Sequence, residues 1–213
     1  MTGSGRRALT GFPANLLVAG RRVLVVGAGR IAARKAQALL DVGAEVHVVA
    51  PEVGSEIRSW ADDGRLTVEE REFRDSDLDD VWLAVTATDV PAVNAAVRAA
   101  GDERRVWVNS ADDPEHCSFT LMSSFRRGDI VVTIGTGGRS PALASWLRER
   151  MENEIGPEYT SLLEVLADAR EELRADGRSS EDADWRRAFD AGILDLVRTG
   201  KVDEAKELLR SCL

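Results

Sequence analysis

The segment 21–42 constrains the fold most, because a buried strand, a glycine-rich turn and a helix follow one another there without a gap. The run Val23 to Val26 is entirely apolar, which is typical of a strand covered on both faces in a parallel sheet. A helix is predicted from about Arg30 to Val42, with an apolar stripe formed by Ala32, Ala36, Leu39 and Leu40. This succession predicts the first strand–helix unit of an α/β fold.

The turn in this segment has the pattern G-x-G-x-x-A, in Gly27-Ala28-Gly29-Arg30-Ile31-Ala32. Gly27 permits a tight turn, and Gly29 lets the backbone approach a pyrophosphate whose charge is met by the helix N-terminus. Ala32 keeps the helix close to the sheet. Because the motif follows a buried strand and opens a helix, it predicts a dinucleotide site in a Rossmann domain. The alternative is a glycine turn in an α/β domain that binds no nucleotide.

The end of the second predicted strand, Glu45 to Ala50, lacks the acidic residue that usually bonds the ribose of NAD. Ala50 and Pro51 stand there, and Glu52 follows two residues late. No arginine stands there either, so the sequence favours NAD over NADP. Glu52 either reaches the ribose or stabilises the start of a helix expected to open at Pro51 and to run to about Asp62.

The rest of the first half continues the alternation of strands and helices. Strands are predicted at 66–70, 81–86 and 105–109, and a helix at 91–100. Short joints between them favour right-handed crossovers and one parallel sheet.

The pattern changes after Asn109. The runs 117–122 and 130–134 read as two strands of a hairpin, with residues 124–129 as the turn between them. Ser140 and Pro141 then look like the N-cap and first residue of a helix, and the chain reads as helical from there to Leu213. Domain boundaries are expected near residues 113 and 150.

Composition excludes several classes of protein. The 213 residues carry a net charge of −9, so the chain is a poor candidate for binding nucleic acid, which requires clustered Lys and Arg. We expect no signal peptide and no membrane span, because no uninterrupted apolar run approaches about 18 residues. Cys117 and Cys212 lie outside any metal-ligand spacing, so both are expected as reduced thiols in a cytoplasmic protein.

Several motifs together resemble one enzyme family. They are the segments 12–16, 25–29, 33–35, 48–52 and 84–89, and more specifically Asn109-Ser110-Ala111-Asp112-Asp113-Pro114, Ser118-Phe119 and Gly137-Gly138-Arg139-Ser140-Pro141-Ala142-Leu143-Ala144. The chain resembles the precorrin-2 dehydrogenases, the N-terminal part of siroheme synthase, over about residues 12–155. That family similarly lacks an acidic residue at the end of the second strand.

The resemblance implies an activity in porphyrin and siroheme biosynthesis. Precorrin-2 would lose two hydrogens to give sirohydrochlorin, with a hydride passing to NAD⁺. Some members also insert Fe²⁺ into sirohydrochlorin, so it implies either dehydrogenation alone or dehydrogenation with ferrochelatase activity. With 213 residues, we expect no methyltransferase module of the fused form.

The resemblance also implies the site residues. The cofactor contacts fall on Gly27, Gly29, Arg30, Ile31, Pro51, Glu52, Thr86, Thr88 and Asp89. Asp112 matches the aspartate that serves the family as general base and as a transient metal ligand during chelation. The alternative is that Asp112-Asp113-Pro114 is an ordinary turn. His116 is expected to be a satisfied side chain without a role, and His47 to be structural.

The tetrapyrrole substrate carries many carboxylates, so an acidic protein must concentrate positive charge locally. The loop before the predicted helix would supply the contacts, with Thr136, Gly137, Gly138, Arg139 and Ser140. Thr136 stands where the family often has serine. Nearby arginines would also contact the substrate: Arg126, Arg127, Arg148 and Arg150. The alternative is that these arginines belong to a solvated helix face, which applies above all to Arg148 and Arg150.

The resemblance finally implies a homodimer. The expected organisation is an NAD-binding Rossmann domain at 1–113, a dimerisation segment at 114–150 and a C-terminal helical domain at 151–213. The alternative from another class is an NAD-binding regulatory domain that senses a ligand without catalysis. Such a domain should carry the acid after the second strand and lack the Gly-Gly-Arg-Ser-Pro segment.

Overall fold

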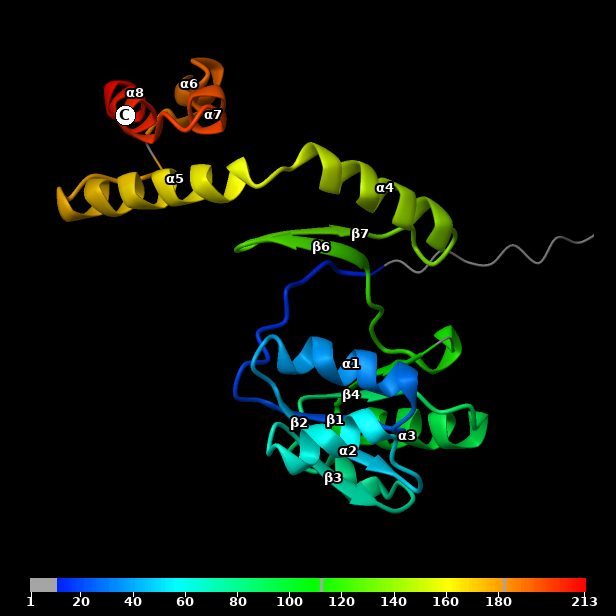
Figure 1. The fold of residues 1–213 in the computed structure, drawn as a ribbon. Helices are drawn as coiled ribbons and strands as arrows, with labels where there is room; N and C mark the ends of the chain where they lie inside the picture. Colours follow the sequence, from blue (N-terminus) through cyan, green and yellow to red (C-terminus); the bar gives the residue numbers. More distant parts are fainter. Residues whose placement is uncertain (1–10, 112, 182) are drawn as a thin grey trace, which may run out of the picture. The chain divides into compact units, whose positions relative to one another are not determined.

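The computed structural model describes residues 11–111, 113–181 and 183–213. It divides into two compact units, residues 11–121 and residues 122–213 (Figure 1). The predicted division into three domains stays a prediction. Asp112, the predicted catalytic residue, lies outside the described residues.

The first unit is built on a five-stranded parallel sheet in the order β3-β2-β1-β4-β5. Its strands are β1 (Arg22–Val26), β2 (Glu45–Ala50), β3 (Thr67–Glu70), β4 (Leu83–Thr86) and β5 (Trp107–Ser110). Its helices are α1 (Arg30–Leu40), α2 (Ser55–Asp62) and α3 (Pro91–Arg104), with short 3₁₀ turns η1 (Asp75–Leu78) and η2 (Pro114–His116). The predicted α/β class and Rossmann-like fold are confirmed.

The central strand β1 is buried on both faces, as its apolar run predicted. Val23 and Val25 pack into the cluster that includes buried residues of α1 and α2. Leu24 and Val26 pack into the opposite cluster, which includes residues of α3 and η1. Alternate residues of one strand thus seal both faces of the sheet, which fixes the strand's register against its neighbours.

The start of α2 differs from the prediction. The helix begins at Ser55, with Gly54 as its N-cap, and not at Pro51. The N–H of Gly54 donates to the carbonyl of Ala28 at 3.1 Å, which ties this segment to the glycine-rich turn instead of to a helix. This contact is tertiary, so the local sequence did not reveal it.

The hairpin of the second unit exists, but its first strand and its turn are shifted. β6 (Ser123–Arg127) pairs antiparallel with β7 (Ile130–Ile134), and Gly128 adopts a positive φ of 55° in the turn. The predicted strand at 117–122 is wrong. The N–H of Ser118 instead donates to the carbonyl of Val108 at 2.7 Å, which holds this stretch against the end of β5.

Helices complete the second unit. In α4 (Pro141–Glu154), Ser140 Oγ accepts the N–H of Leu143 at 3.2 Å, so the predicted N-cap is confirmed. Four further helices share an apolar core that includes Leu162, Ile193 and Leu209: α5 (Glu158–Ala175), α6 (Trp185–Asp190), α7 (Ile193–Arg198) and α8 (Val202–Cys212).

Candidate cofactor site

A cavity of about 1060 Å³ opens at the carboxyl ends of β1, β2 and β4. This is the edge of a parallel α/β sheet where ligands bind. Most of the predicted cofactor residues line this one cavity: Gly27, Gly29, Arg30, Ile31, Pro51, Glu52, Thr88 and Asp89. The structure thus brings together residues that span three loops of the sequence.

The two glycines of the turn are required for different reasons. Gly27 has a φ of 105°, and a Cβ there would lie 2.5 Å from the carbonyl oxygen of Ala87, so the fold itself demands glycine. Gly29 has a φ of −82°, and no heavy atom lies within 4 Å of where its Cβ would stand. Nothing in the described protein therefore requires glycine at 29.

The space beside Gly29 fits a pyrophosphate. Gly29 is the N-cap of α1, and the first turn of this helix carries no acidic residue. Its free N–H groups and dipole favour an anion at this point, and a side chain at 29 would project into the approach. The described residues thus fit a dinucleotide, with its pyrophosphate on the first turn of α1.

The structure bears on the two interpretations of Glu52. Since α2 starts at Ser55, the acid in its first turn is Glu56, and Glu52 lies before the helix on the cavity wall. Ala50, at the end of β2, is buried at 3% exposure. Glu52 is therefore not in the first turn of α2, and its contact with the ribose stays a prediction.

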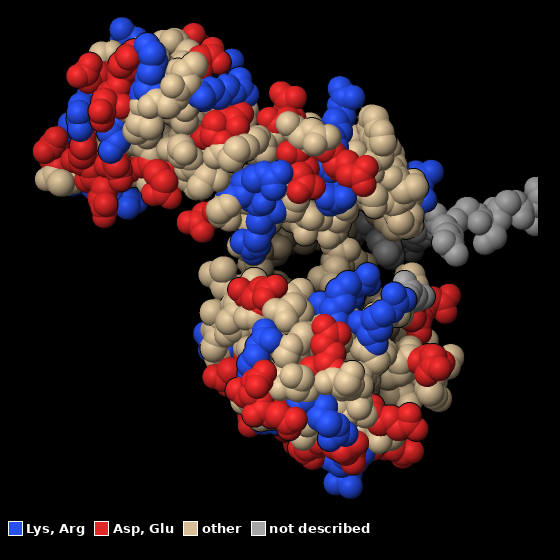
Figure 2. All heavy atoms as spheres, in the orientation of Figure 1, with Lys and Arg blue, Asp and Glu red and all other residues tan. Residues whose placement is uncertain are grey.

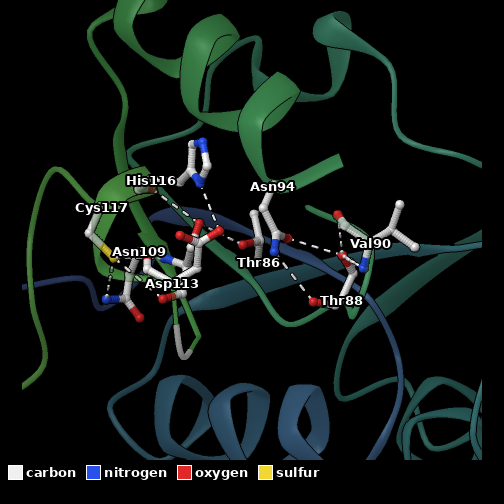
Figure 3. Close-up of polar contacts among 9 residues, drawn as sticks. Thr86, Thr88, Val90, Asn94, Asn109, Asp113, His116 and Cys117 are labelled. Atoms are coloured by element: carbon white, nitrogen blue, oxygen red, sulfur yellow. Dashed lines mark hydrogen bonds and ion pairs between the residues drawn. The ribbon is translucent and has the colours of Figure 1, made fainter. Parts of the chain in front are cut away.

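Thr86 departs from the predicted set, because it does not line the cavity. It is fully buried, and its Oγ1 donates to Ser110 Oγ at 2.8 Å. Thr88 reaches the cavity, and its Oγ1 donates to Asn94 Oδ1 at 3.0 Å and accepts the N–H of Val90 at 3.2 Å (Figure 3). Thr86 thus ties the end of β4 to β5, while Thr88 holds the start of the loop between β4 and α3.

The loop after β5 is held by a network around Cys117 (Figure 3). The N–H of Ser110 donates to Cys117 Sγ at 3.1 Å, and Ser110 Oγ donates to the carbonyl of His116 at 3.1 Å. Burial raises the pKa of the Cys117 thiol, so it stays protonated and donates to the carbonyl of Ser110. Both cysteines are free, as the sequence predicted.

The two neighbours of Asp112 are fixed in place. The N–H of Ala111 donates to the carbonyl of Thr86 at 2.9 Å, and Ala111 lines the cavity. On the other side, Asp113 Oδ2 lies 2.7 Å from His116 Nδ1. The chain therefore enters the segment of Asp112 directly from the cavity wall.

Glu72 and Phe73 are two of the cavity residues that the sequence prediction missed. Glu72 and Phe73 follow β3 and line the same cavity as the glycine-rich turn. Their position just beyond the carboxyl end of a predicted strand was the available signal, since that end of the sheet carries the ligand loops.

The predicted substrate loop belongs to the second unit. Thr136 Oγ1 donates to the carbonyl of Ser140 at 3.0 Å and accepts its N–H at 3.2 Å, while Gly137 and Gly138 adopt positive φ. Arg139 is exposed. The structure therefore gathers these five residues into one tight turn before α4.

The arginines near this turn fall into two groups. Arg127 and Arg148 both pair with Glu152, at 3.4 Å and 2.5 Å, and Arg150 lies over the ring of Trp146. Arg126 is exposed like Arg139. Arg127 and Arg148 thus have an acidic partner within the chain, whereas Arg126 and Arg139 are exposed.

Metal clusters and membrane-spanning helices are both absent from the part of the chain that the structure describes. Within 11–111, 113–181 and 183–213, no three His, Cys, Asp or Glu side chains gather to hold a metal ion. Over the same ranges, no helix is long and apolar enough to cross a membrane.

Comparison with known proteins identifies the family. A family model described as putative NAD(P)-binding matches residues 14–123. The chain belongs to this NAD(P)-binding family. The match agrees with the predicted cofactor, NAD.

The curated relatives that this chain matches include siroheme synthases. The chain is 33% identical to a siroheme synthase of Nitrosococcus oceani over 204 residues, which is 95% of this chain and 44% of the relative. It is 36% identical to a siroheme synthase of Xylella fastidiosa over 207 residues, 95% of this chain and 43% of the relative. The chain thus spans less than half the length of these curated relatives.

One solved structure is matched over its whole length. The structure described as SirC, precorrin-2 dehydrogenase, superposes with a TM-score of 0.72 at 28% identity, over 94% of this chain and 100% of that one. The predicted resemblance to the siroheme-synthesis family is confirmed. These matches give no support to the alternative of a regulatory NAD-binding domain.

Proposed function

We propose that this chain oxidises precorrin-2 to sirohydrochlorin, with NAD⁺ as the hydride acceptor. The observation that supports it most is the fold match over the full length of a precorrin-2 dehydrogenase, in a chain whose dinucleotide cavity is lined by the expected residues. The comparison of folds alone would not suffice, because one fold hosts many functions.

The order of the loops orients the cofactor. With the pyrophosphate at Gly29 and the adenosine ribose at Glu52, the nicotinamide half extends over the opposite part of the sheet, toward β4 and β5. Ala111 lines the cavity there. The reacting carbon of the substrate then meets the nicotinamide beside the segment that carries Asp112.

Asp112 is our proposed general base. Dehydrogenation removes a hydride and a proton; NAD⁺, when bound, would supply the hydride acceptor, and the carboxylate of Asp112 would accept the proton. The bonds of Ala111 to Thr86 and of Ser110 to Cys117 and His116 fix the approach to this segment. We propose no direct cofactor contact for Thr86, whose hydroxyl is buried.

The substrate carboxylates require cations and backbone donors. We propose that the turn 136–140 supplies both, with Arg139 as the cation, and that the exposed Arg126 on β6 adds a second positive charge to this unit. On the face drawn in Figure 2, basic residues are interspersed with acidic ones.

A homodimer completes the proposal. In the second unit, the hairpin β6–β7 and α4 leave large apolar side chains exposed, among them Val131, Leu143 and Trp146. A two-stranded hairpin with one helix does not bury a core by itself. A second copy of the chain would cover this surface. With free cysteines and an NAD-linked reaction, we place the protein in the cytoplasm.

An anaerobic assay tests the activity. Purified protein is mixed with precorrin-2 and NAD⁺, and sirohydrochlorin and NADH are followed by absorbance. Both should rise together, in equal amounts, and neither without protein. No oxidation with either NAD⁺ or NADP⁺ would refute the function. Fe²⁺ added afterwards separates dehydrogenation from the iron insertion that the resemblance also implied.

A further inference from the structure

The turn after β3 forms a wall of the cofactor cavity. β2 and β3 pair in parallel with Ala50 opposite Glu70, so the chain leaves both strands at the same edge. Two residues beyond this pair stand Glu52 and Glu72, and both line the cavity. Two carboxylates from neighbouring strand ends therefore face one part of it.

A buried ion pair holds this turn in place. The guanidinium of Arg71 donates to both oxygens of Asp77, at 2.8 Å and 2.7 Å, and its Nη1 also donates to the carbonyl of Glu72 at 3.0 Å. Asp77 is 6% exposed and accepts the N–H of Arg74 at 2.8 Å. The clamp therefore fixes Glu72 and Phe73 before any ligand arrives, which lowers the entropic cost of binding.

The residues beside the carboxylates are apolar. Phe73 and Val93 both pack against the buried cluster that contains Val26 and Val49. Both also line the cavity, together with Ala92 and Ala96 of α3. An apolar crevice between the β3 turn and α3, with carboxylates at its edge, suits a flat heteroaromatic ring joined to a sugar diol.

We propose that Phe73 and the first turns of α3 hold the adenine ring of the cofactor, and that Glu72 acts with Glu52 on the adenosine ribose. Glu72 then replaces the acidic residue that is missing at Ala50: its carboxylate accepts a hydrogen bond from a ribose hydroxyl and repels a 2′-phosphate. The inference rests on the dinucleotide cofactor of the proposed function and is independent of the tetrapyrrole substrate.

Binding measurements with whole and truncated cofactors test this subsite. The full chain is titrated with NADH, NADPH and reduced nicotinamide mononucleotide, which lacks adenosine, and nucleotide fluorescence gives each Kd. Phe73→Ala should weaken NADH about tenfold, the loss typical when an aromatic side chain under a base is removed. It should leave the affinity for the mononucleotide unchanged, which also shows that the cavity remains folded. Phe73→Leu should recover part of the NADH affinity.

The carboxylate is tested by charge removal. Glu72→Gln should raise the affinity for NADPH relative to NADH by about tenfold, because a like charge beside the 2′-phosphate is removed. Glu70→Gln is the matched control, since Glu70 pairs with Arg58 outside the cavity and should leave the ratio unchanged.

Each of these measurements has a result that would overturn the proposed adenosine subsite. An unchanged NADH affinity in Phe73→Ala, an equal loss for the mononucleotide, or an unchanged NADPH ratio in Glu72→Gln overturns the subsite. A wild-type chain that binds no dinucleotide overturns both the subsite and the proposed function. A chain that binds NADH as expected but leaves precorrin-2 unoxidised overturns only the latter.

Discussion

Asp113 Oδ2 lies 2.7 Å from His116 Nδ1, and both side chains are partly buried. The pair lies one residue beyond Asp112 in the sequence. His116 is therefore a satisfied loop side chain, as the sequence suggested, and Asp113 has a structural partner that the sequence did not reveal. Any test of Asp112 must leave this pair intact.

The first prediction concerns Asp112→Ala. Loss of a general base should lower kcat by about 10²–10⁴, with little change in NAD⁺ affinity because the cofactor is held by other loops. Turnover and NADH binding are measured on the same preparation. Asp113→Asn is the control, because the amide oxygen can still accept a hydrogen bond from His116, and most activity should remain. Wild-type turnover in Asp112→Ala refutes the assignment, and loss of NAD⁺ binding there indicates a structural turn.

The second prediction separates the two glycines. Gly29→Val should abolish dinucleotide binding while the melting temperature stays near that of wild type, because its backbone is unstrained and its surroundings are open. Gly27→Ala should lower the melting temperature as well, since the new Cβ meets the Ala87 carbonyl. Thermal denaturation and NADH fluorescence measure both effects. Normal binding by Gly29→Val would contradict the site.

The third prediction is a preference for NAD⁺ over NADP⁺. Of the charged residues that line the cavity, Glu52, Glu72 and Asp89 are acidic and Arg30 is basic. Arg30 starts α1 beside the pyrophosphate, so no cation stands at the end of β2 for a 2′-phosphate. Titration with both reduced cofactors decides, and tighter binding of NADPH would refute the preference.

The fourth prediction is a homodimer joined through the second unit. Light scattering at micromolar concentration should give twice the mass of the chain. Trp146→Glu should shift the protein toward monomer, because Trp146 is 54% exposed on α4 of the apolar surface. Trp107→Glu is the control, since Trp107 is equally exposed, at 55%, but begins β5 of the first unit. A monomeric wild type, or equal effects of both variants, would contradict it.

The sequence predicted what local patterns determine. The apolar run of β1, the turn at Gly27 and the N-cap Ser140 each depend on neighbours within a few residues, and all three are confirmed. The start of α2 and the strand at 117–122 were wrong because tertiary hydrogen bonds, from Gly54 to Ala28 and from Ser118 to Val108, override local preference. Glu72 and Phe73 reach the cavity only through the register of β3 on β2, which no local pattern specifies.

The last prediction concerns Asp77, the anchor of the β3 turn. Burial opposes its ionisation, but the hydrogen bonds from Arg71 and from the Arg74 N–H outweigh it, and the pKa of Asp77 is lowered. A lowered folded-state pKa stabilises the fold above the unfolded pKa of about 4, and this contribution is lost as the pH falls through the folded value. Asp77→Ala should cost about 1–3 kcal/mol at pH 7, because Arg71 and the N–H of Arg74 lose a buried acceptor while Arg71 keeps its ion pair with Glu69. Urea unfolding of both proteins from pH 7 to pH 3 should show the difference shrinking toward the acid end, and a difference that is independent of pH would show that packing, not charge, holds the turn.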